Sequence, residues 1–242
     1  MGVLSNKIER KQLKRGDHIY SWRQAYLFAH HGIYVNEQVV IHFTTGTPTS
    51  VNSLFTSSAP SFDTNNIPCP ICGDRSKTRT KNGVFSSCLD CFLSGGELCR
   101  FLYGVNKLHF LVQARGGTCT LASSDPTDEV IYRAIYLLEN GFGDYHVSKN
   151  NCENFAMYCK TGLQVITNDS VGGGSGQATS YLAAAKSVVF SSIPVVASYY
   201  SPALVGCLWY SRKRLISDIG YRKDVTIKVP VERISEMARR EN

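Results

Sequence analysis

The first fifteen residues lack the apolar core of an export signal. They carry five basic residues and no hydrophobic stretch behind them. A secretory signal needs an apolar run of about 7–15 residues after its positive start. We therefore expect a protein of a reducing compartment, in the cytoplasm or on the cytoplasmic face of a membrane.

The sequence also lacks a dense run of Lys and Arg interleaved with aromatic residues, which is typical of nucleic-acid-binding surfaces. The net charge is +7, with basic residues gathered at 7–15, at 77–81 and from Arg212 onward. We expect no nucleic-acid partner. A basic surface of this kind suits an anionic membrane equally well.

A disulfide framework is missing too, because the nine cysteines are an odd number. Four of them form two C-x-x-C pairs, Cys69 with Cys72 and Cys88 with Cys91, separated by fifteen residues. This spacing predicts one structural Zn²⁺ held by four thiolates. Two disulfides or a redox pair are the alternatives, and a reducing compartment favours zinc. A filled ligand shell leaves no open position for catalysis, so the metal would staple a small insert.

A fifth cysteine, Cys152, lies at the predicted start of a helix. Asn150 can act as N-cap, Glu153 can close a capping box, and Thr161-Gly162 ends the pattern. Cys152 would then be the second helical residue, where free N–H groups and the helix dipole lower a thiol pKa. This position predicts a nucleophile, with a buried structural cysteine as the alternative.

Residues 30–43 predict a hairpin of two short strands rich in β-branched residues. If the turn has three residues, Gly32 lies opposite His42, and His30 and His42 share one face. If the turn has two residues, His31 lies opposite His42 instead. Either register brings two imidazoles together, one to take a proton from a thiol and one to orient it.

His30-x-Gly-Ile-Tyr, His42 twelve residues later, and Asn151-Cys152-Glu153-x-Phe155 resemble the lecithin:retinol acyltransferase (LRAT) domain. The resemblance extends from Arg15 to Gly162. It implies an α+β fold, a permuted NlpC/P60 (papain-like) antiparallel sheet with packed helices. It also implies Cys152 as nucleophile, His30 as general base and His42 as the orienting residue, and so favours His30 over His31.

Cys88-Leu-Asp-Cys91-Phe-Leu-x-Gly-Gly further resembles the plant, lead-sensitive branch of the family, in which the Cys₄ zinc knuckle is an insert. We expect strands at 101–105 and 109–112 after the insert, then a helix at 130–139 that leads to the cysteine helix. The expected organisation is a basic segment 1–15, an LRAT-like domain 16–165 with a zinc-binding insert 66–96, a Gly/Ser linker 166–180, an apolar membrane-associating segment 181–214 and a basic tail 215–242.

Within the apolar segment, residues 187–210 carry no charge. A helix of this length, at ~1.5 Å per residue, could cross a ~30 Å hydrocarbon layer. Pro194 and Pro202 interrupt such a helix, so a membrane hairpin or an interfacial insertion is the better expectation. The alternative is a helix pair buried against the domain.

Together these features predict a thiol acyltransferase or phospholipase that acts on membrane phospholipid through an acyl-enzyme, as the resemblance implies. Two other readings stay open. The domain could be a catalytically silent interaction module, or the thiol could cleave peptide bonds as in other NlpC/P60 relatives.

Overall fold

The structure is a computed structural model, and it shows the expected α+β class. It describes residues 6–23, 28–45, 69–73, 82–113, 115–147, 150–167, 170–171, 176, 202–222 and 226–240. Residues 46–68, between the predicted hairpin and Cys69, lie outside the described residues. So do the Gly-rich stretch 172–175 and residues 187–201 of the apolar segment.

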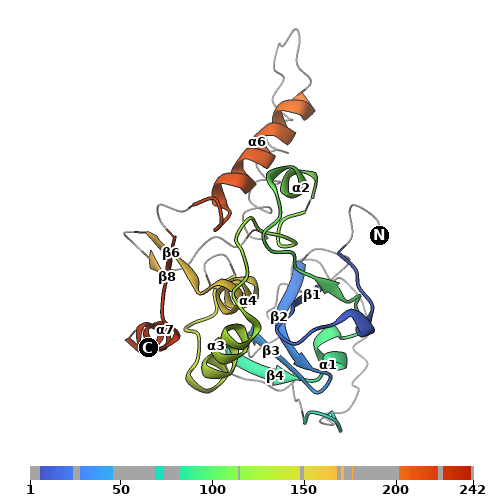
Figure 1. The fold of residues 1–242 in the computed structure, drawn as a ribbon, viewed down its shortest axis with the longest axis vertical. Helices are drawn as coiled ribbons and strands as arrows, with labels where there is room; N and C mark the ends of the chain where they lie inside the picture. The colour runs from blue at the N-terminus through green and yellow to red at the C-terminus, as the bar shows by residue number, and fades with distance from the viewer. Residues whose placement is uncertain are drawn as a thin grey trace, which may run out of the picture.

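A five-stranded antiparallel sheet with the strand order β4-β3-β2-β1-β5 forms the centre of the fold (Figure 1). Its strands are β1 (His18–Arg23), β2 (Phe28–Asn36), β3 (Val39–Thr44), β4 (Gly83–Ser87) and β5 (Cys99–Arg100). A smaller sheet has the order β7-β6-β8. It is made of β6 (Leu163–Thr167), β7 (Ser170–Val171) and β8 (Thr226–Lys228).

The two faces of the central sheet are covered by different helices. Helices α3 (Thr127–Asn140), α4 (Cys152–Thr161) and α7 (Val231–Arg240) share one hydrophobic cluster with the sheet. The short helix α1 (Leu89–Leu93) packs in a second cluster with β1, β2 and β3. Because side chains alternate along a strand, neighbouring residues of β2 enter different clusters, Ile33 the first and Tyr34 the second.

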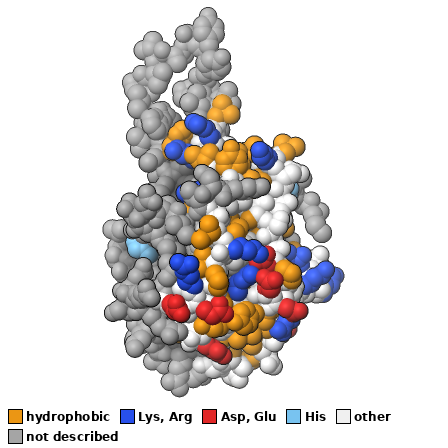
Figure 2. All heavy atoms as spheres, turned by 60° about the vertical axis from the view of Figure 1, so that its left-hand side comes forward, with side chains coloured by type: hydrophobic (Ala, Val, Ile, Leu, Met, Phe, Trp, Pro, Cys, Tyr) orange, Lys and Arg blue, Asp and Glu red, His pale blue; other side chains and the backbone are white. Residues whose placement is uncertain are grey.

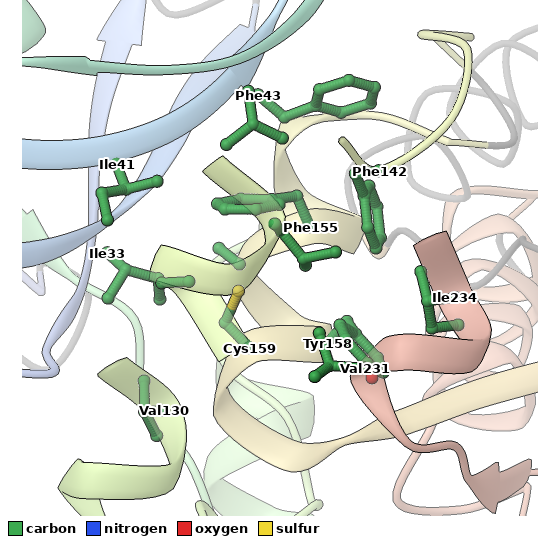
Figure 3. Packing of buried hydrophobic residues seen from close by; sticks show 14 of the residues in the cluster. Ile33, Ile41, Phe43, Val130, Phe142, Phe155, Tyr158, Cys159, Val231 and Ile234 are labelled. Carbon is green, nitrogen blue, oxygen red and sulfur yellow. The ribbon is translucent and has the colours of Figure 1, made fainter. Parts of the chain in front are cut away.

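The larger cluster fixes the position of α4. Phe155 of α4 lies between Phe43 of β3 and Phe142 and is fully buried (Figure 3). Ile234 of α7 belongs to the same cluster. Full burial of an aromatic side chain of this size contributes about 1.5–3 kcal/mol. The packing therefore holds the first turn of α4 firmly against the sheet.

The β2–β3 hairpin turns at Glu37-Gln38. This is a two-residue turn, but a shift in register between Tyr34 and Asn36 adds one residue to β2 just before it. Ile33 consequently pairs with Ile41. That is the register expected for a three-residue turn, now produced by a shorter turn and a bulge.

The strand prediction at 109–112 is wrong. These residues belong to a helix, α2 (Lys107–Val112), because the Asn106 side chain accepts a hydrogen bond from the His109 N–H and caps the first turn. At 101–105 the structure has a single bridge from Leu102 to Cys119 beyond the end of β5. The helix expected at 130–139 is confirmed as α3, which ends at Gly141 with φ of 85°.

The C-terminal residues form further elements. Helix α6 (Pro202–Ser217) covers the last part of the expected apolar segment 181–214. No helix within the described ranges is long and apolar enough to cross a membrane. Residues 215–242, expected as a basic tail, include β8 and α7, and Val231 and Ile234 are buried in the main cluster. The short 3₁₀ helix η1 (Arg10–Gln12) lies in the N-terminal basic segment.

Candidate active site

Helix α4 starts one residue later than the sequence suggested. The N-cap is Asn151, whose side chain accepts hydrogen bonds from the N–H groups of Glu153 (2.9 Å) and Asn154 (3.2 Å). Asn154, not Glu153, closes the capping box, since its side chain accepts from the Asn151 N–H at 3.1 Å. Asn150 is otherwise engaged, because its amide donates to two carbonyls of the preceding loop. Cys152 is therefore the first residue of the helix.

The Cys152 thiol is buried against the backbone of β2. Its side chain is almost inaccessible, and the thiol donates to the Ala29 carbonyl with a sulfur–oxygen distance of 3.7 Å. Burial raises the pKa of Cys152 to about 11. Hydrogen bonds from the His31 backbone and the Tyr145 side chain oppose this rise in pKa, and the charge of Glu153 adds to it. The expectation of a lowered pKa is thus wrong for this state, because desolvation outweighs the helix dipole.

His30 and His42 form a direct hydrogen bond. The distance from His30 Nε2 to His42 Nδ1 is 2.9 Å, and the rings meet edge to face at 85°. On its far side, His42 Nε2 lies 3.2 Å from the hydroxyl of Ser87, the last residue of β4. Sequence reasoning missed Ser87, which becomes a neighbour of His42 only when β4 pairs with β3.

One set of tautomers suits this chain to base catalysis. If His42 donates from Nε2 to the hydroxyl of Ser87, its Nδ1 accepts from the Nε2–H of His30. His30 Nδ1 then carries a lone pair that can accept a proton. This assignment follows from the chemistry of the neighbouring groups.

His31 points to a different set of partners. Its Nδ1 lies 2.9 Å from Nε2 of His18, and Nδ1 of His18 lies 2.7 Å from the Tyr103 hydroxyl. Both histidines are fully buried, and burial lowers the pKa of His31 to about 3, so its ring is neutral. The hairpin thus places two histidine pairs on opposite faces of the sheet, and the partner of His42 is His30.

The thiol and the histidine pair lie at the same position along β2. Cys152 touches the backbone at Ala29 and His31, the residues on either side of His30. The His30 ring lies on the face covered by α1, 5.3 Å from the Phe92 ring, while α4 covers the other face. The structure thus brings His30 and His42 into contact on one face of the sheet and places the Cys152 thiol against the backbone of the same strand.

The four cysteines of the two C-x-x-C pairs also come together. Their sulfur atoms all lie within 4.8 Å of one another, with Cys69 and Cys88 at 3.9 Å and Cys72 and Cys91 at 3.7 Å. A disulfide needs ~2.05 Å, so these are free thiols. A tetrahedral metal with ~2.3 Å metal–sulfur bonds has sulfur–sulfur edges of about 3.8 Å. The cluster fits one four-coordinate soft metal ion.

The turn after Cys69 has the geometry of a metal knuckle. Gly73 has φ of 65° and donates its N–H to the Cys69 carbonyl at 2.7 Å. Backbone hydrogen bonds from Cys72 and Ile71 lower the pKa of Cys69 to about 7. Such N–H groups stabilise a thiolate, which is the form that binds metal.

The raised pKa of Cys152 gives a testable pH dependence. The neutral thiol is favoured in the folded protein, so alkylation of Cys152 by iodoacetamide should still accelerate at pH 10. In urea the alkylation rate of Cys152 should instead level off once the pH exceeds the ordinary thiol pKa of 9.0. Peptide-resolved mass spectrometry of timed reactions measures both profiles. A plateau below pH 7 in the folded protein would instead reveal a resting thiolate.

A cysteine that opens a helix packed on an antiparallel sheet, with paired histidines on the sheet, fits the papain-like class of α+β domains. Within that class the chain belongs to the lecithin retinol acyltransferase family, whose model matches residues 11–165. It is also 50% identical over 239 residues to Protein LEAD-SENSITIVE 1 of Arabidopsis thaliana, covering 96% of this chain and 90% of that protein. The resemblance to the plant branch is thereby confirmed.

Proposed function

We propose that this protein is a thiol acyltransferase or phospholipase that acts on membrane phospholipid through Cys152, His30 and His42. The observation that carries the proposal is the hydrogen-bonded chain from Ser87 through His42 to His30, on the strand that the Cys152 thiol touches. Membership of the family supports the same chemistry.

The proposed reaction has two steps, acylation of Cys152 and release of the acyl group. For this reaction the His30 ring must turn from the α1 face toward the edge of β2, where the thiol lies. Its Nδ1 then takes the thiol proton as the Cys152 sulfur attacks the ester carbonyl carbon. The tetrahedral intermediate collapses to a thioester, and His30 returns the proton to the departing lysophospholipid oxygen. Water, or an acceptor alcohol or amine, then attacks the thioester, with His30 taking its proton and returning it to the sulfur.

The developing oxyanion needs hydrogen-bond donors near the sulfur. The N–H groups of Glu153 and Asn154 are already bound by the N-cap side chain, so they are poor candidates. We assign this role to the Cys152 N–H and the Tyr145 hydroxyl. Burial and the neighbouring Cys152 thiol raise the pKa of Tyr145, so its hydroxyl stays protonated and can donate.

The pKa of Cys152 implies that the thiol is neutral between turnovers. Proton transfer to His30 then accompanies attack instead of preceding it. A substrate that enters the site must also open access to a side chain that is buried in this state.

We further propose that the four-cysteine cluster binds a structural Zn²⁺. The sulfur–sulfur distances and the absence of any remaining ligand position support a structural role. In the same proposal the fold is the permuted form of the papain-like class, with the zinc-binding insert 66–96 inside a catalytic domain 16–165. The Gly/Ser linker is 166–180, and residues 181–214 form the membrane-associating segment.

The surface of α2 and α6 supports contact with a membrane. Neither helix contains an acidic residue. Exposed apolar side chains occur on both, with Leu108 at 73% and Leu208 at 62% of their full exposure. Arg212 and Lys213 are exposed beside them on α6. Figure 2 shows hydrophobic and basic side chains interspersed at this end of the molecule.

This face is also connected to the site. A small cavity with room for about one water molecule is lined by Phe110 of α2, Arg214 of α6 and Glu153 of α4, the residue next to Cys152. In this proposal, lipid bound at α2 and α6 lies on the side of the domain from which α4 begins.

Reversing charge on α6 tests the membrane contact. The double substitution of Arg212 and Lys213 by glutamate should weaken binding to sedimented vesicles of phosphatidylserine and phosphatidylcholine by at least about thirtyfold, as ~1 kcal/mol is expected per basic residue near an anionic surface. Arg233→Glu, an exposed charge on α7, serves as the control. Equal binding by the two variants would contradict a role for α6.

The acyl-enzyme is the direct test of the function. The zinc-loaded protein incubated with phospholipid vesicles should gain the mass of one fatty acyl chain. Peptide mapping should locate the thioester on Cys152, and hydroxylamine should release it. The proposal would be removed if no ester or peptide substrate gave an adduct in repeated experiments and phospholipid vesicles released no free fatty acid.

One observation favours a second candidate, the catalytically silent interaction module. A buried Cys152 with a raised pKa is also what a structural cysteine shows. In that case the fold and the cysteine cluster would present a binding surface without turnover.

A further inference from the structure

The second cysteine pair is joined to the histidine pair through the sequence itself. Ser87 directly precedes Cys88, and Phe92 directly follows Cys91. Both neighbours are buried in the protein. The two residues beside the metal ligands are therefore available to contact the core.

What they contact is His30 and His42. The Ser87 hydroxyl lies 3.2 Å from His42 Nε2. The Phe92 ring lies 5.3 Å from the His30 ring and 5.7 Å from the His42 ring. The hydrogen bond sets the rotation of His42, and the aromatic ring limits the movement of both imidazoles.

Close packing leaves Phe92 little freedom. A Cβ atom added to Gly32 would lie only 2.8 Å from the Phe92 ring, so the glycine makes room for that ring. The Arg23 guanidinium donates to the carbonyls of Phe92 and Leu93 at the end of α1. The Leu89 N–H donates to the Glu37 carbonyl in the hairpin turn at 3.0 Å. Helix α1 is thus bound to the hairpin turn at its start and to β1 at its end.

We propose that metal binding by the cysteine cluster positions the histidine pair, with Ser87 and Phe92 as the positioning residues. Holding Cys88 and Cys91 on one ion fixes the start and the middle of α1, and so fixes the two side chains that touch the imidazoles. Loss of the ion frees the last residue of β4 and the first turn of α1. This inference rests on the proposed function only for the catalytic role of the histidines. Their positions can be measured without any substrate.

Nitrogen-15 NMR of the histidine rings tests the positioning directly. The protein has six histidines, and His30→Gln and His42→Gln assign the two signals of interest. Ser87→Ala should change the ring nitrogen shifts of His42 and His30 and lower kcat about tenfold with KM little changed, the effect of one lost hydrogen bond. Ser87→Thr keeps the hydroxyl and should restore both. Ser86→Ala, the exposed neighbour, is the matched control and should change neither.

Metal removal forms a second arm that needs no substitution. Treatment of the zinc-loaded protein with a strong chelator should move the same His30 and His42 signals, and added Zn²⁺ should return them. The His18 and His31 signals, on the other face of the sheet, should move much less. Unchanged His30 and His42 signals in the folded Ser87→Ala variant and in the metal-free protein would overturn the proposal. Absence of acyl transfer with these shifts intact would overturn the proposed function alone.

Discussion

Replacing Cys152 by serine should lower the rate of acyl transfer by at least about a thousandfold and abolish the covalent adduct. A hydroxyl is a much weaker acid and nucleophile than a thiol, and loss of a nucleophile removes nearly all turnover in covalent catalysis. The substitution exchanges one atom at a buried site, so the fold should survive it. Release of radiolabelled fatty acid from phospholipid vesicles measures the rate.

Cys159→Ala is the matched control for this substitution. Cys159 is a fully buried thiol of the same helix, and burial raises its pKa as it does for Cys152. It lies in the main hydrophobic cluster, so its replacement should cost stability but leave kcat within about twofold. Equal losses of activity in the two variants would mean that damage to α4, not removal of a nucleophile, explains the effect.

A substitution at Cys152 also distinguishes an enzyme from a catalytically silent interaction module. A scaffold should tolerate Cys152→Ala, so the variant would restore a mutant phenotype as fully as the wild type. An enzyme should not tolerate it. Thermal unfolding of the variant must first show that α4 is intact, because Cys152 contacts the backbone of β2.

The sequence predicts the histidine pair well because its information is local. Alternation along a strand and the spacing between His30 and His42 are enough to put both rings on one face. The turn was harder to predict. The shift in register between Tyr34 and Asn36 depends on how β2 packs, which the local sequence does not reveal. The pairing expected for a three-residue turn therefore arises from a two-residue turn and a bulge.

The properties of Cys152 depend on distant parts of the chain. Local sequence predicts a helix start, and the structure agrees to within one residue. It cannot predict that β2, more than a hundred residues away in the sequence, buries the sulfur and reverses the expected change in its pKa. Ser87 is invisible for the same reason. Its contact with His42 exists only because β4 pairs with β3 at the end of the insert.

The C-x-x-C pairs lie between these cases. Their spacing alone predicts the cluster of four sulfur atoms, which the structure shows. Nothing in the spacing says that the cluster touches the candidate site. That relation appears only once α1, which carries Cys91 and Phe92, packs beneath the histidines.

Loss of the metal should lower the melting temperature by about 10 °C. Binding of structural zinc is worth ~10–16 kcal/mol in zinc-finger peptides. We expect only about 3 kcal/mol of it to reach the domain, since β4 remains paired with β3, and each kcal/mol shifts the midpoint by roughly 2–4 °C at this chain length. Cys72→Ser, a half-buried ligand on the outer knuckle, removes one ligand with little loss of core packing. Differential scanning calorimetry with metal analysis of each sample measures both quantities.

Ile71→Ser provides the comparison, because Ile71 is the exposed neighbour of Cys72 in the same knuckle and supplies no ligand. It should keep one zinc per chain and the wild-type midpoint. A Cys72→Ser protein that holds no metal and melts with the wild type would show that the cluster does not stabilise the domain. The metal would then not restrain α1, and the sheet alone would determine the geometry of the histidine pair. Stability and imidazole position should therefore change together in Cys72→Ser and stay unchanged together in Ile71→Ser.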